Sequence, residues 1–332
     1  MKESNDNSQT FVDQIKILIR TAQLDVVRTV NNLMVKTYFE LGRRIVENEQ
    51  SGSDNAEYGV YILKKLSKAL TDEFGKGYSK RNLELIRKFY ITYRIAKSPI
   101  SQSLTWTHYL HLMRIENEAE RNFYEIETIG NKWSVRELSR QINSLLYERL
   151  QQGKDTIGIR KLSNRGQIIE KPLDLIKDPY VLEFLDLADN SHFNETDFES
   201  ALIDKLEHFM LELGKGFTFV GRQVRFTFEE EHFRIDLVFY HRLLKCFVLI
   251  DLKIGKLKHQ DLGQMQMYVN YYDRFVKMED ENETIGIILC KDKKDSMVEI
   301  SLPKNNKQIF ASKYQFYLPT EEQLLAELSR IG

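Results

Sequence analysis

Two apolar runs, residues 233–240 and 246–253, constrain the fold more than any other part of this 332-residue chain. Both are rich in valine, isoleucine, leucine and phenylalanine, which is typical of strands buried in a sheet. Each run contains one aspartate, Asp236 or Asp251, and Lys253 follows two residues after Asp251. A carboxylate in such surroundings is costly unless it is paired, so these positions require a chemical explanation.

An antiparallel hairpin would bring these groups together. If its turn is centred between Leu243 and Leu244, Asp236 faces Asp251, and Lys253 shares their face because side chains alternate along a strand. Two carboxylates at close range repel each other, and a divalent cation removes that conflict. Oxygen ligands favour Mg²⁺ or Mn²⁺, and the lysine is placed to hold a water or stabilise charge at phosphorus. The alternative is a set of internal salt bridges.

The first half of the chain has a different pattern. Residues 10–150 carry apolar side chains at spacings of three and four, which predicts helices. The string FGKGYS at 74–79 separates two of them, because its glycines suit a helix end and Ser79 suits an N-cap. This arrangement is compatible with a helix-turn-helix unit, although any helical bundle contains similar hairpins of helices.

Charge is unevenly distributed along the chain. The formal net charge is −1, yet ten basic and only three acidic residues lie between Ile62 and Lys97. Such an excess suits either a polyanion or a solvated helix face. The candidate nucleic-acid contacts are basic residues in and beyond this segment: Lys80, Arg81, Arg87, Arg222 and Lys256.

The helical pattern stops near residue 150, and strands then alternate with helices. We predict an all-α helical domain at 1–155, a linker at 156–178 and a mixed α/β domain at 179–332. Expected elements of the last domain are a short helix at 180–187, a helix at about 197–213, strands at 233–240, 246–253, 284–290 and about 308–316, and helices at about 259–275 and 320–330.

Several classes of protein are excluded by composition. The chain has no run of eighteen apolar residues, its first ten residues are polar, and Cys246 and Cys290 are its only cysteines. We therefore expect no membrane span, no signal peptide and no disulfide scaffold. A cytoplasmic protein fits this composition.

A resemblance to a known family rests on longer strings. Asp236, a turn and then Asp251-Leu252-Lys253 resemble the PD-(D/E)XK nuclease superfamily. ELGKGFTFVGRQ and DLKIGKLKHQDLGQMQMY resemble the nuclease domain of bacterial YhcG-type proteins, and LSKALTDEFGKGYSKRNLELIRKFY resembles their helical domain. The likeness covers nearly the whole chain. It departs from the pattern at Ile235, where the superfamily name has proline, and at Asp251, where YhcG-type proteins usually have glutamate.

The resemblance implies a restriction-endonuclease-like fold and a metal-dependent DNA endonuclease. It implies that Mg²⁺ or Mn²⁺ is held by Asp236, Asp251 and the Leu252 carbonyl, that Lys253 orients the attacking water, and that Gln264 contacts substrate or water. Hydrolysis would leave a 5′-phosphate and a 3′-hydroxyl. Branched or foreign DNA, in repair, recombination or defence, is the expected substrate. Cutting both strands takes two sites, so a homodimer is the expected assembly.

The resemblance also implies a metal-binding glutamate on the helix before the sheet. Glu199 fits, because Leu202 and Leu206 follow it at the implied spacing. The alternative is that Glu199 only closes a capping box with Thr196, in which case Glu207 is the remaining candidate.

A second interpretation of the whole chain belongs to another class of function. The protein would be a nucleic-acid-binding or assembly module whose nuclease core is silent or depends on a partner. The aspartate at 251 and the basic pair of helices are compatible with both interpretations.

Overall fold

The computed structural model describes residues 2–51, 56–94, 103–151, 154–187, 193–318, 320 and 322. The chain folds as two compact units, Met1–Leu138 and Ser139–Gly332. The first is helical and the second is a mixed α/β domain, so the predicted fold class is confirmed. No helix in the described ranges is long and apolar enough to cross a bilayer.

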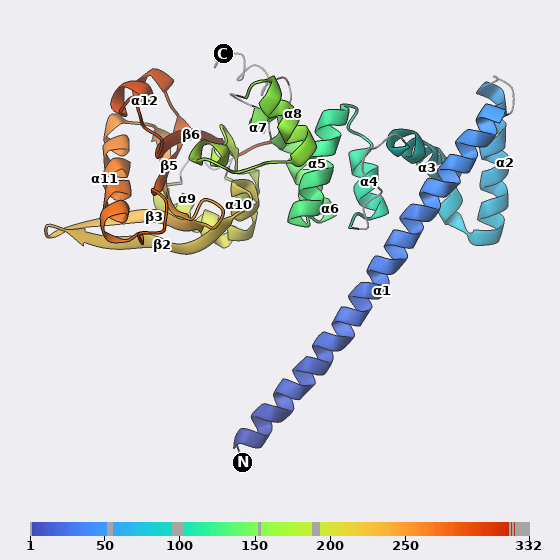
Figure 1. The fold of residues 1–332 in the computed structure, drawn as a ribbon, viewed down its shortest axis with the longest axis horizontal. Coiled ribbons are helices and arrows are strands. Elements are labelled where there is room, and N and C mark those ends of the chain that lie inside the picture. The colour runs from blue at the N-terminus through green and yellow to red at the C-terminus, as the bar shows by residue number, and fades with distance from the viewer. Residues whose placement is uncertain are drawn as a thin grey trace. The chain divides into compact units, whose positions relative to one another are not determined.

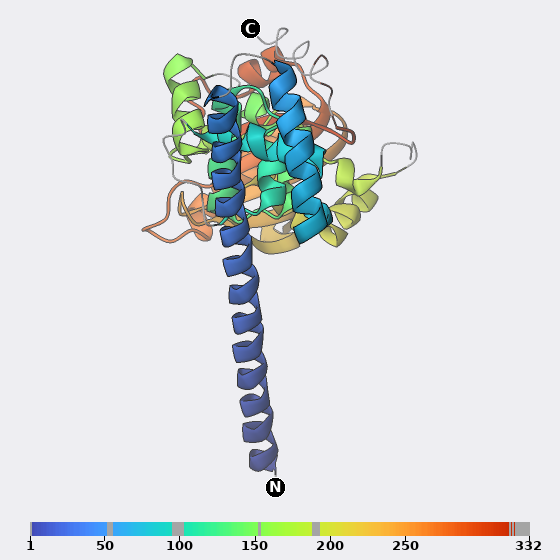
Figure 2. The same cartoon turned by 90° about the vertical axis from the view of Figure 1, so that its right-hand side faces the viewer.

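In its described residues the first unit contains helices and no strand (Figures 1 and 2). A close helix pair lies at its centre, because a Cβ on Gly42 would come within 2.5 Å of the Ile86 carbonyl oxygen. Around this contact the Phe89 ring packs 4.8 Å from Tyr109 and 5.3 Å from Trp106. The helices are α1 (Lys2–Ser51), α2 (Ala56–Phe74), the 3₁₀ turn η1 (Lys76–Tyr78), α3 (Lys80–Tyr93), α4 (Trp106–Leu112), α5 (Glu118–Asn131) and the start of α6 (Val135–Asn143).

Local capping explains where these helices begin. The Ser79 hydroxyl accepts the Asn82 N–H at 3.3 Å, which starts α3 directly after the glycine-containing turn. The predicted break between two helices is therefore confirmed. At α6 the Ser134 N–H donates to the Glu137 carboxylate at 2.5 Å, and the Glu137 N–H donates to the Ser134 hydroxyl at 3.3 Å. These reciprocal bonds satisfy donors that have no partner within the helix.

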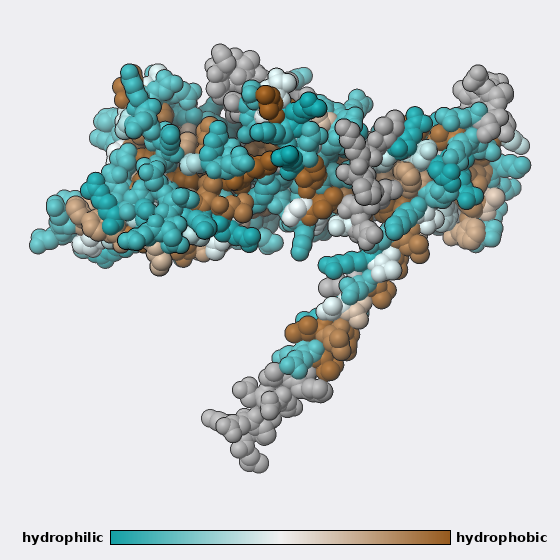
Figure 3. All heavy atoms as spheres, in the orientation of Figure 1, coloured by the Kyte–Doolittle hydropathy of each residue, from teal (hydrophilic) through white to brown (hydrophobic). Residues whose placement is uncertain are grey.

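The part of α1 up to Leu33 exposes apolar side chains, unlike the part that follows. Val35, Tyr38 and Ile45 are buried, but nine apolar residues nearer the N-terminus are at least 40% exposed. Figure 3 shows them as patches of apolar surface along the helix. They are Val12, Ile15, Ile17, Leu18, Ile19, Val26, Val27, Val30 and Leu33.

A six-stranded sheet forms the second unit, with strand order β1-β6-β5-β4-β3-β2. β2 (Phe217–Phe228), β3 (Glu231–His241) and β4 (Cys246–Lys256) are antiparallel neighbours. β5 (Ile285–Asp292), β6 (Ile309–Gln315) and β1 (Tyr180–Val181) continue the sheet from β4 in parallel pairs. The helical elements are the end of α6, α7 (Leu146–Gln151), α8 (Thr156–Arg165), η2 (Pro172–Leu175), η3 (Glu183–Leu185), α9 (Glu195–Asp204), α10 (Leu206–Leu213), α11 (His259–Phe275) and α12 (Asp295–Ser301).

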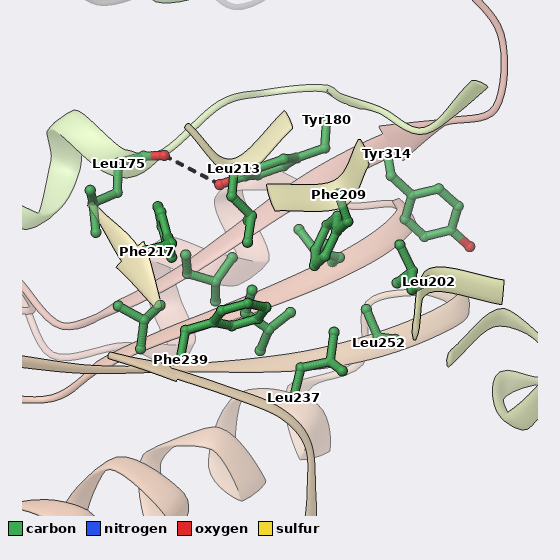
Figure 4. Packing of buried hydrophobic residues seen from close by; sticks show 14 of the residues in the cluster. Leu175, Tyr180, Leu202, Phe209, Leu213, Phe217, Leu237, Phe239, Leu252 and Tyr314 are labelled. Carbon is green, nitrogen blue, oxygen red and sulfur yellow. Dashed lines mark hydrogen bonds between the residues drawn. The ribbon is translucent and has the colours of Figure 1, made fainter. Parts of the chain in front are cut away.

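Separate apolar clusters cover the two faces of this sheet. On one face Leu202 of α9 and Phe209 of α10 pack on Leu237 and Phe239 (Figure 4), and the Tyr180 hydroxyl donates to the Leu175 carbonyl at 3.3 Å. The other face packs against α11 through residues that include Met265, Tyr268 and Val269. A Cβ on Gly286 would lie 2.5 Å from the Met265 sulfur, so this small residue lets α11 approach the sheet.

The hairpin register agrees with the predicted turn centre. Leu237 pairs with Ile250 and His241 with Cys246, so the midpoint lies between Leu243 and Leu244. The predicted helix at 259–275 matches the bounds of α11, and the predicted strands correspond to β3, β4, β5 and β6. The predicted helix at 320–330 falls almost wholly outside the described residues.

Three expectations differ from the structure. The helix predicted at 180–187 is wrong, because Tyr180–Val181 pairs with β6 and only a 3₁₀ turn follows. The helix expected over about 197–213 is interrupted at Lys205, whose φ is −113°. The predicted linker at 156–178 contains α8 and η2, and Leu162 and Leu175 are buried there. Its apolar residues are too widely spaced to give a clear helical period.

A buried ion cluster ties the helices after residue 139 to the sheet domain. Glu212 of α10 is fully buried, and its carboxylate lies 2.5 Å from the Arg149 guanidinium and accepts the Val181 N–H at 3.0 Å. Arg140 bridges the same carboxylate and Glu183. Burial alone would raise the pKa of Glu212, but the neighbouring cations Arg149, Lys177 and Arg140 outweigh it and lower that pKa to about 2.

Neutralising this carboxylate should destabilise the sheet domain. Glu212→Gln keeps the size of the side chain but leaves Arg149 as a buried charge without its counterion, at an expected cost of about 3 kcal/mol in unfolding free energy. Urea denaturation followed by circular dichroism measures this loss. Glu183→Gln removes a partly exposed partner and should cost clearly less; equal losses for the two variants would contradict the account.

Candidate active site

The candidate site lies where β3 and β4 part. The last backbone pair between them is Leu237 with Ile250. Beyond this pair, the N–H of Leu252, two residues after Ile250, donates to Oδ2 of Asp236 at 2.8 Å. A side-chain carboxylate thus takes a donor that a continuing strand would have used, and the strands can separate without losing a hydrogen bond.

Asp251 and Lys253 of β4 lie beside this opening. The Lys253 Nζ is 2.8 Å from Oδ2 of Asp251, and the two side chains are 17% and 4% exposed. Among the described residues, this ammonium is the only polar partner of the buried Oδ2. A carboxylate oxygen held by a single ammonium can exchange that partner for a metal cation.

Gln223 of β2 joins the third carboxylate to the first. Its side-chain amide donates to Oε2 of Glu199 at 2.6 Å and to Oδ1 of Asp236 at 3.1 Å. Gln223 has φ of 47°, a left-handed conformation that non-glycine residues rarely adopt, and the register of β2 shifts nearby, between Phe219 and Gly221. Glu199 of α9 is 7% exposed and therefore belongs to the interior of the site.

The capping explanation for Glu199 is wrong. The reciprocal cap at the start of α9 is made by Asn194 and Asp197, with bonds of 2.9 and 3.0 Å. Glu207, the remaining candidate for the helix carboxylate, is exposed on α10. The structure therefore brings Glu199 to Asp236 and leaves Glu207 in solvent.

Burial first, and neighbouring negative charge second, determine the protonation of the site. Burial, and then the charge of Asp236, raise the pKa of Asp251 to about 7 despite the opposing effect of Lys253. Burial raises the pKa of Asp236, although the hydrogen bond from the Leu252 N–H acts to lower it. Burial also raises the pKa of Glu199, although the Gln223 amide lowers it. For Lys253, burial alone would lower the pKa, but Asp251 raises it.

Gln264 is held by a short relay on α11. Its side-chain amide donates to the Tyr268 hydroxyl, which donates to the Arg234 carbonyl on β3 at 2.9 Å. Tyr268 is buried at 1% exposure, so the relay has a rigid base. Because the amide nitrogen is engaged, the Gln264 carbonyl oxygen is the group left to accept a hydrogen bond.

The predicted nucleic-acid contacts are divided between the two units. Lys80 lies 3.7 Å from Glu84, Arg87 pairs with Glu49 at 2.6 Å, and Lys256 lies 3.4 Å from Asp292. Arg87 therefore joins α3 to α1, which is a structural contact. The exposed residues Arg81 and Arg222 are in the first and second units respectively.

No three histidine, cysteine, aspartate or glutamate side chains surround a common point within the residues the structure describes. The Gln223 amide is hydrogen-bonded to both Glu199 and Asp236, and the Lys253 ammonium forms an ion pair with Asp251. The donor set nevertheless fits a divalent cation, because the buried Oδ2 of Asp251 has only one ammonium as its partner and the neighbouring acids have raised pKa values. Sequence reasoning missed the bridging role of Gln223, which no motif signals.

Comparisons with known proteins identify the family of this chain. Residues 173–329 match the family model "YhcG PDDEXK nuclease domain", and residues 14–149 match "DUF1016 N-terminal domain". The chain is 38% identical over 353 aligned positions to the Escherichia coli (strain K12) protein named "Putative nuclease YhcG", covering 97% of this chain and 94% of that protein. A crystal structure of a repair endonuclease from Pyrococcus abyssi aligns over 40% of this chain and about half (51%) of its own, at 16% identity and a TM-score of 0.27.

The raised pKa of Asp251 predicts a pH-dependent stability. Between the pKa of an unfolded aspartate and about 7, the native state binds the extra proton, so unfolding free energy falls as pH rises through this window and stays low above it. A tenfold difference in proton affinity between the folded and unfolded states corresponds to about 1.4 kcal/mol. In metal-free buffer, Asp251→Asn should flatten the fall between pH 5 and pH 8 in urea titrations. Asp280→Asn, the same charge change at an exposed site, is the control, and equal pH slopes in both variants would refute the assignment.

Proposed function

We propose that this chain, which belongs to the YhcG family of proteins with a PDDEXK nuclease domain, is a metal-dependent endonuclease that hydrolyses phosphodiester bonds in DNA. The observation that carries the proposal is the meeting of Asp236, Asp251 and Lys253 where β3 and β4 separate. Acidic oxygen ligands beside an ammonium group are what hydrolysis of a phosphodiester requires.

The residues proposed to hold Mg²⁺ or Mn²⁺ are Asp236, Asp251 and Glu199, together with the Leu252 carbonyl. A bound ion would polarise the scissile phosphate and lower the pKa of a coordinated water. Asp236 is already oriented by the Leu252 N–H, which leaves its second oxygen facing Gln223. The Gln223 amide keeps Glu199 and Asp236 within reach of one another before an ion is present.

Lys253 has the second role in this proposal. While Asp251 is ionised and has no other partner, the ammonium stays beside it at 2.8 Å. Once the carboxylate is neutralised by other means, the ammonium is released to donate to the attacking water or to a phosphate oxygen. The Gln264 carbonyl oxygen can accept a hydrogen bond from the same water, because its amide is fixed by Tyr268.

The finer parts of the proposal concern substrate and setting. Branched or foreign DNA is the proposed substrate, in repair, recombination or defence, and the proposed products carry a 5′-phosphate and a 3′-hydroxyl. The helical domain, proposed at 1–155, would deliver DNA through Lys80 and Arg81. A homodimer would place one site on each strand, and a cytoplasmic location would give access to the DNA.

A second candidate function is a binding or assembly module with a silent or partner-dependent core. One feature of the site favours it: every proposed carboxylate ligand already has a polar partner. Gln223 is hydrogen-bonded to Glu199 and Asp236, and Lys253 is paired with Asp251. Binding of an ion must overcome both contacts. The two candidates differ in whether purified protein cleaves DNA without a partner.

Cleavage of supercoiled, linear and branched DNA in Mg²⁺ or Mn²⁺ tests the proposal. Asp236→Asn and Lys253→Ala should each lower the single-turnover rate by about 10²–10³-fold, because each removes a charge needed in the transition state. Glu207→Gln, on the exposed side of α10, should cleave like wild type. Equal rates for wild type and Lys253→Ala would reject the assignment, and binding without cleavage under every metal would favour the silent module.

Metal binding can be followed apart from activity. Isothermal titration of Mn²⁺ should give weaker binding to Asp236→Asn and Glu199→Gln than to wild type, by roughly tenfold or more. Affinity should increase as pH rises through about 7, because Asp251 must lose its proton before it can act as a ligand. Unchanged affinity in Glu199→Gln would remove the helix carboxylate from the site.

A further inference from the structure

The β2–β3 hairpin has two chemically different faces. Phe226 and Phe233 form a cross-strand pair whose rings stack at 5.3 Å, and Phe226 also stacks on Tyr271 of α11 at 4.1 Å. Side chains alternate along a strand, so Arg225 and Arg234 project from the opposite face. The face away from α11 is therefore cationic.

This cationic face continues from the candidate active site. On β3, Arg234 and Asp236 flank Ile235, whose side chain is buried in the cluster that packs against α11. Arg234 therefore projects away from α11. Asp236 is drawn to the same side by its hydrogen bond with Gln223, which also bonds Glu199 of α9, the helix that packs on that face of the sheet. Arg225 is the direct cross-strand partner of Arg234.

The arginine pair, Arg225 and Arg234, is costly without a ligand. Two like charges directly opposite each other on neighbouring strands repel. Both side chains are exposed, and among the described residues neither has a carboxylate within ion-pair distance. Lys80, Arg87 and Lys256, in contrast, each have an acidic partner. An arrangement that repels when empty is relieved by a bound anion.

We propose that the arginine pair binds the phosphate backbone of the nucleic-acid substrate next to the scissile bond. This inference rests on the proposed nuclease function and deepens it. The planar guanidinium forks bind phosphate oxygens through two parallel hydrogen bonds. One phosphate held at the pair would align the neighbouring phosphate with Asp236, because both groups lie on one face of one hairpin.

The outer part of the β2–β3 hairpin favours a single phosphate backbone as ligand over a broad polyanionic surface. The next pair on the same face, Thr227 and His232, is joined by a 2.9 Å hydrogen bond between the hydroxyl and the ring nitrogen. Glu229 and Glu230 then form the turn, both with positive φ. This acidic turn ends the cationic face. A phosphate is therefore expected to bind at the end of the hairpin near the active site and not at the tip of the hairpin.

Direct binding measurements test the pair without any cleavage. In a Lys253→Ala background with EDTA, fluorescence anisotropy of a labelled DNA duplex and of one of its strands is recorded across a range of salt concentrations. Removing both arginines (Arg225→Ala with Arg234→Ala) should reduce the slope of log K against log salt by about 0.9 per lost contact on duplex and about 0.7 on single strand. Arg242→Ala is the matched control, an exposed arginine beyond the other end of β3.

Two further measurements separate binding from a structural role. The double alanine variant should unfold at the same temperature as its parent or higher, because it removes a repulsion. Replacing both arginines with lysine should keep most of the salt slope, since the charge remains. A lower unfolding temperature in the alanine variant without rescue by lysine would overturn the proposal.

The remaining outcomes distinguish this inference from the proposed function. A salt slope equal to that of Arg242→Ala would overturn the proposed role of the arginine pair, even if wild type cleaves DNA. The same holds if the double alanine variant loses binding to polyglutamate, a polyanion without phosphate, but keeps binding to DNA. A wild type that binds DNA through the pair but cleaves nothing in any metal would overturn the nuclease proposal and leave the pair in place.

Discussion

The hydrogen bond from the Leu252 N–H to the Asp236 carboxylate is the contact on which the candidate site depends. It lets two antiparallel strands separate while the Leu252 N–H keeps a hydrogen-bond acceptor. The separation leaves room for Glu199 of α9 to reach Asp236 from one side of the sheet through Gln223. It also places Asp251 and Lys253 at the edge of an otherwise apolar interior.

The site stores electrostatic repulsion instead of relieving it. Burial and the charge of Asp236 make Asp251 a weak acid, and Gln223 is held in a left-handed conformation to bridge two acids. Arg225 and Arg234 also repel each other, as two cations on neighbouring strands, and neither has a carboxylate partner among the described residues. Such costs persist only when the surrounding structure imposes them, and here the two packed faces of the sheet do so. Ligands of both signs would stabilise this region: a cation at the acids and an anion at the arginines.

Much of the C-terminal fold could be predicted from the sequence because its local signals agree. The short turn and the two apolar runs fix the hairpin register, since a slip of one residue would turn every buried side chain outward. The role of Gln223 could not be read in the same way, because it depends on an irregular stretch of β2 with positive φ. The role of Glu199 is ambiguous in the sequence, because Thr196 and Asn194 are both suitable N-caps and the structure uses Asn194. The two residues of β1 owe their strand to pairing with β6 rather than to any pattern of their own.

The buried carboxylate of Glu212 has a consequence for dissecting the chain. Its counterion, Arg149, lies in α7, before the matched nuclease segment that begins at residue 173. A fragment cut at that boundary would keep the buried acid and Lys177 but discard both guanidinium partners, Arg149 and Arg140, and the charge of Glu212 would be only partly compensated. The smallest autonomous nuclease core should therefore begin upstream of Arg140, within the helical part of the molecule.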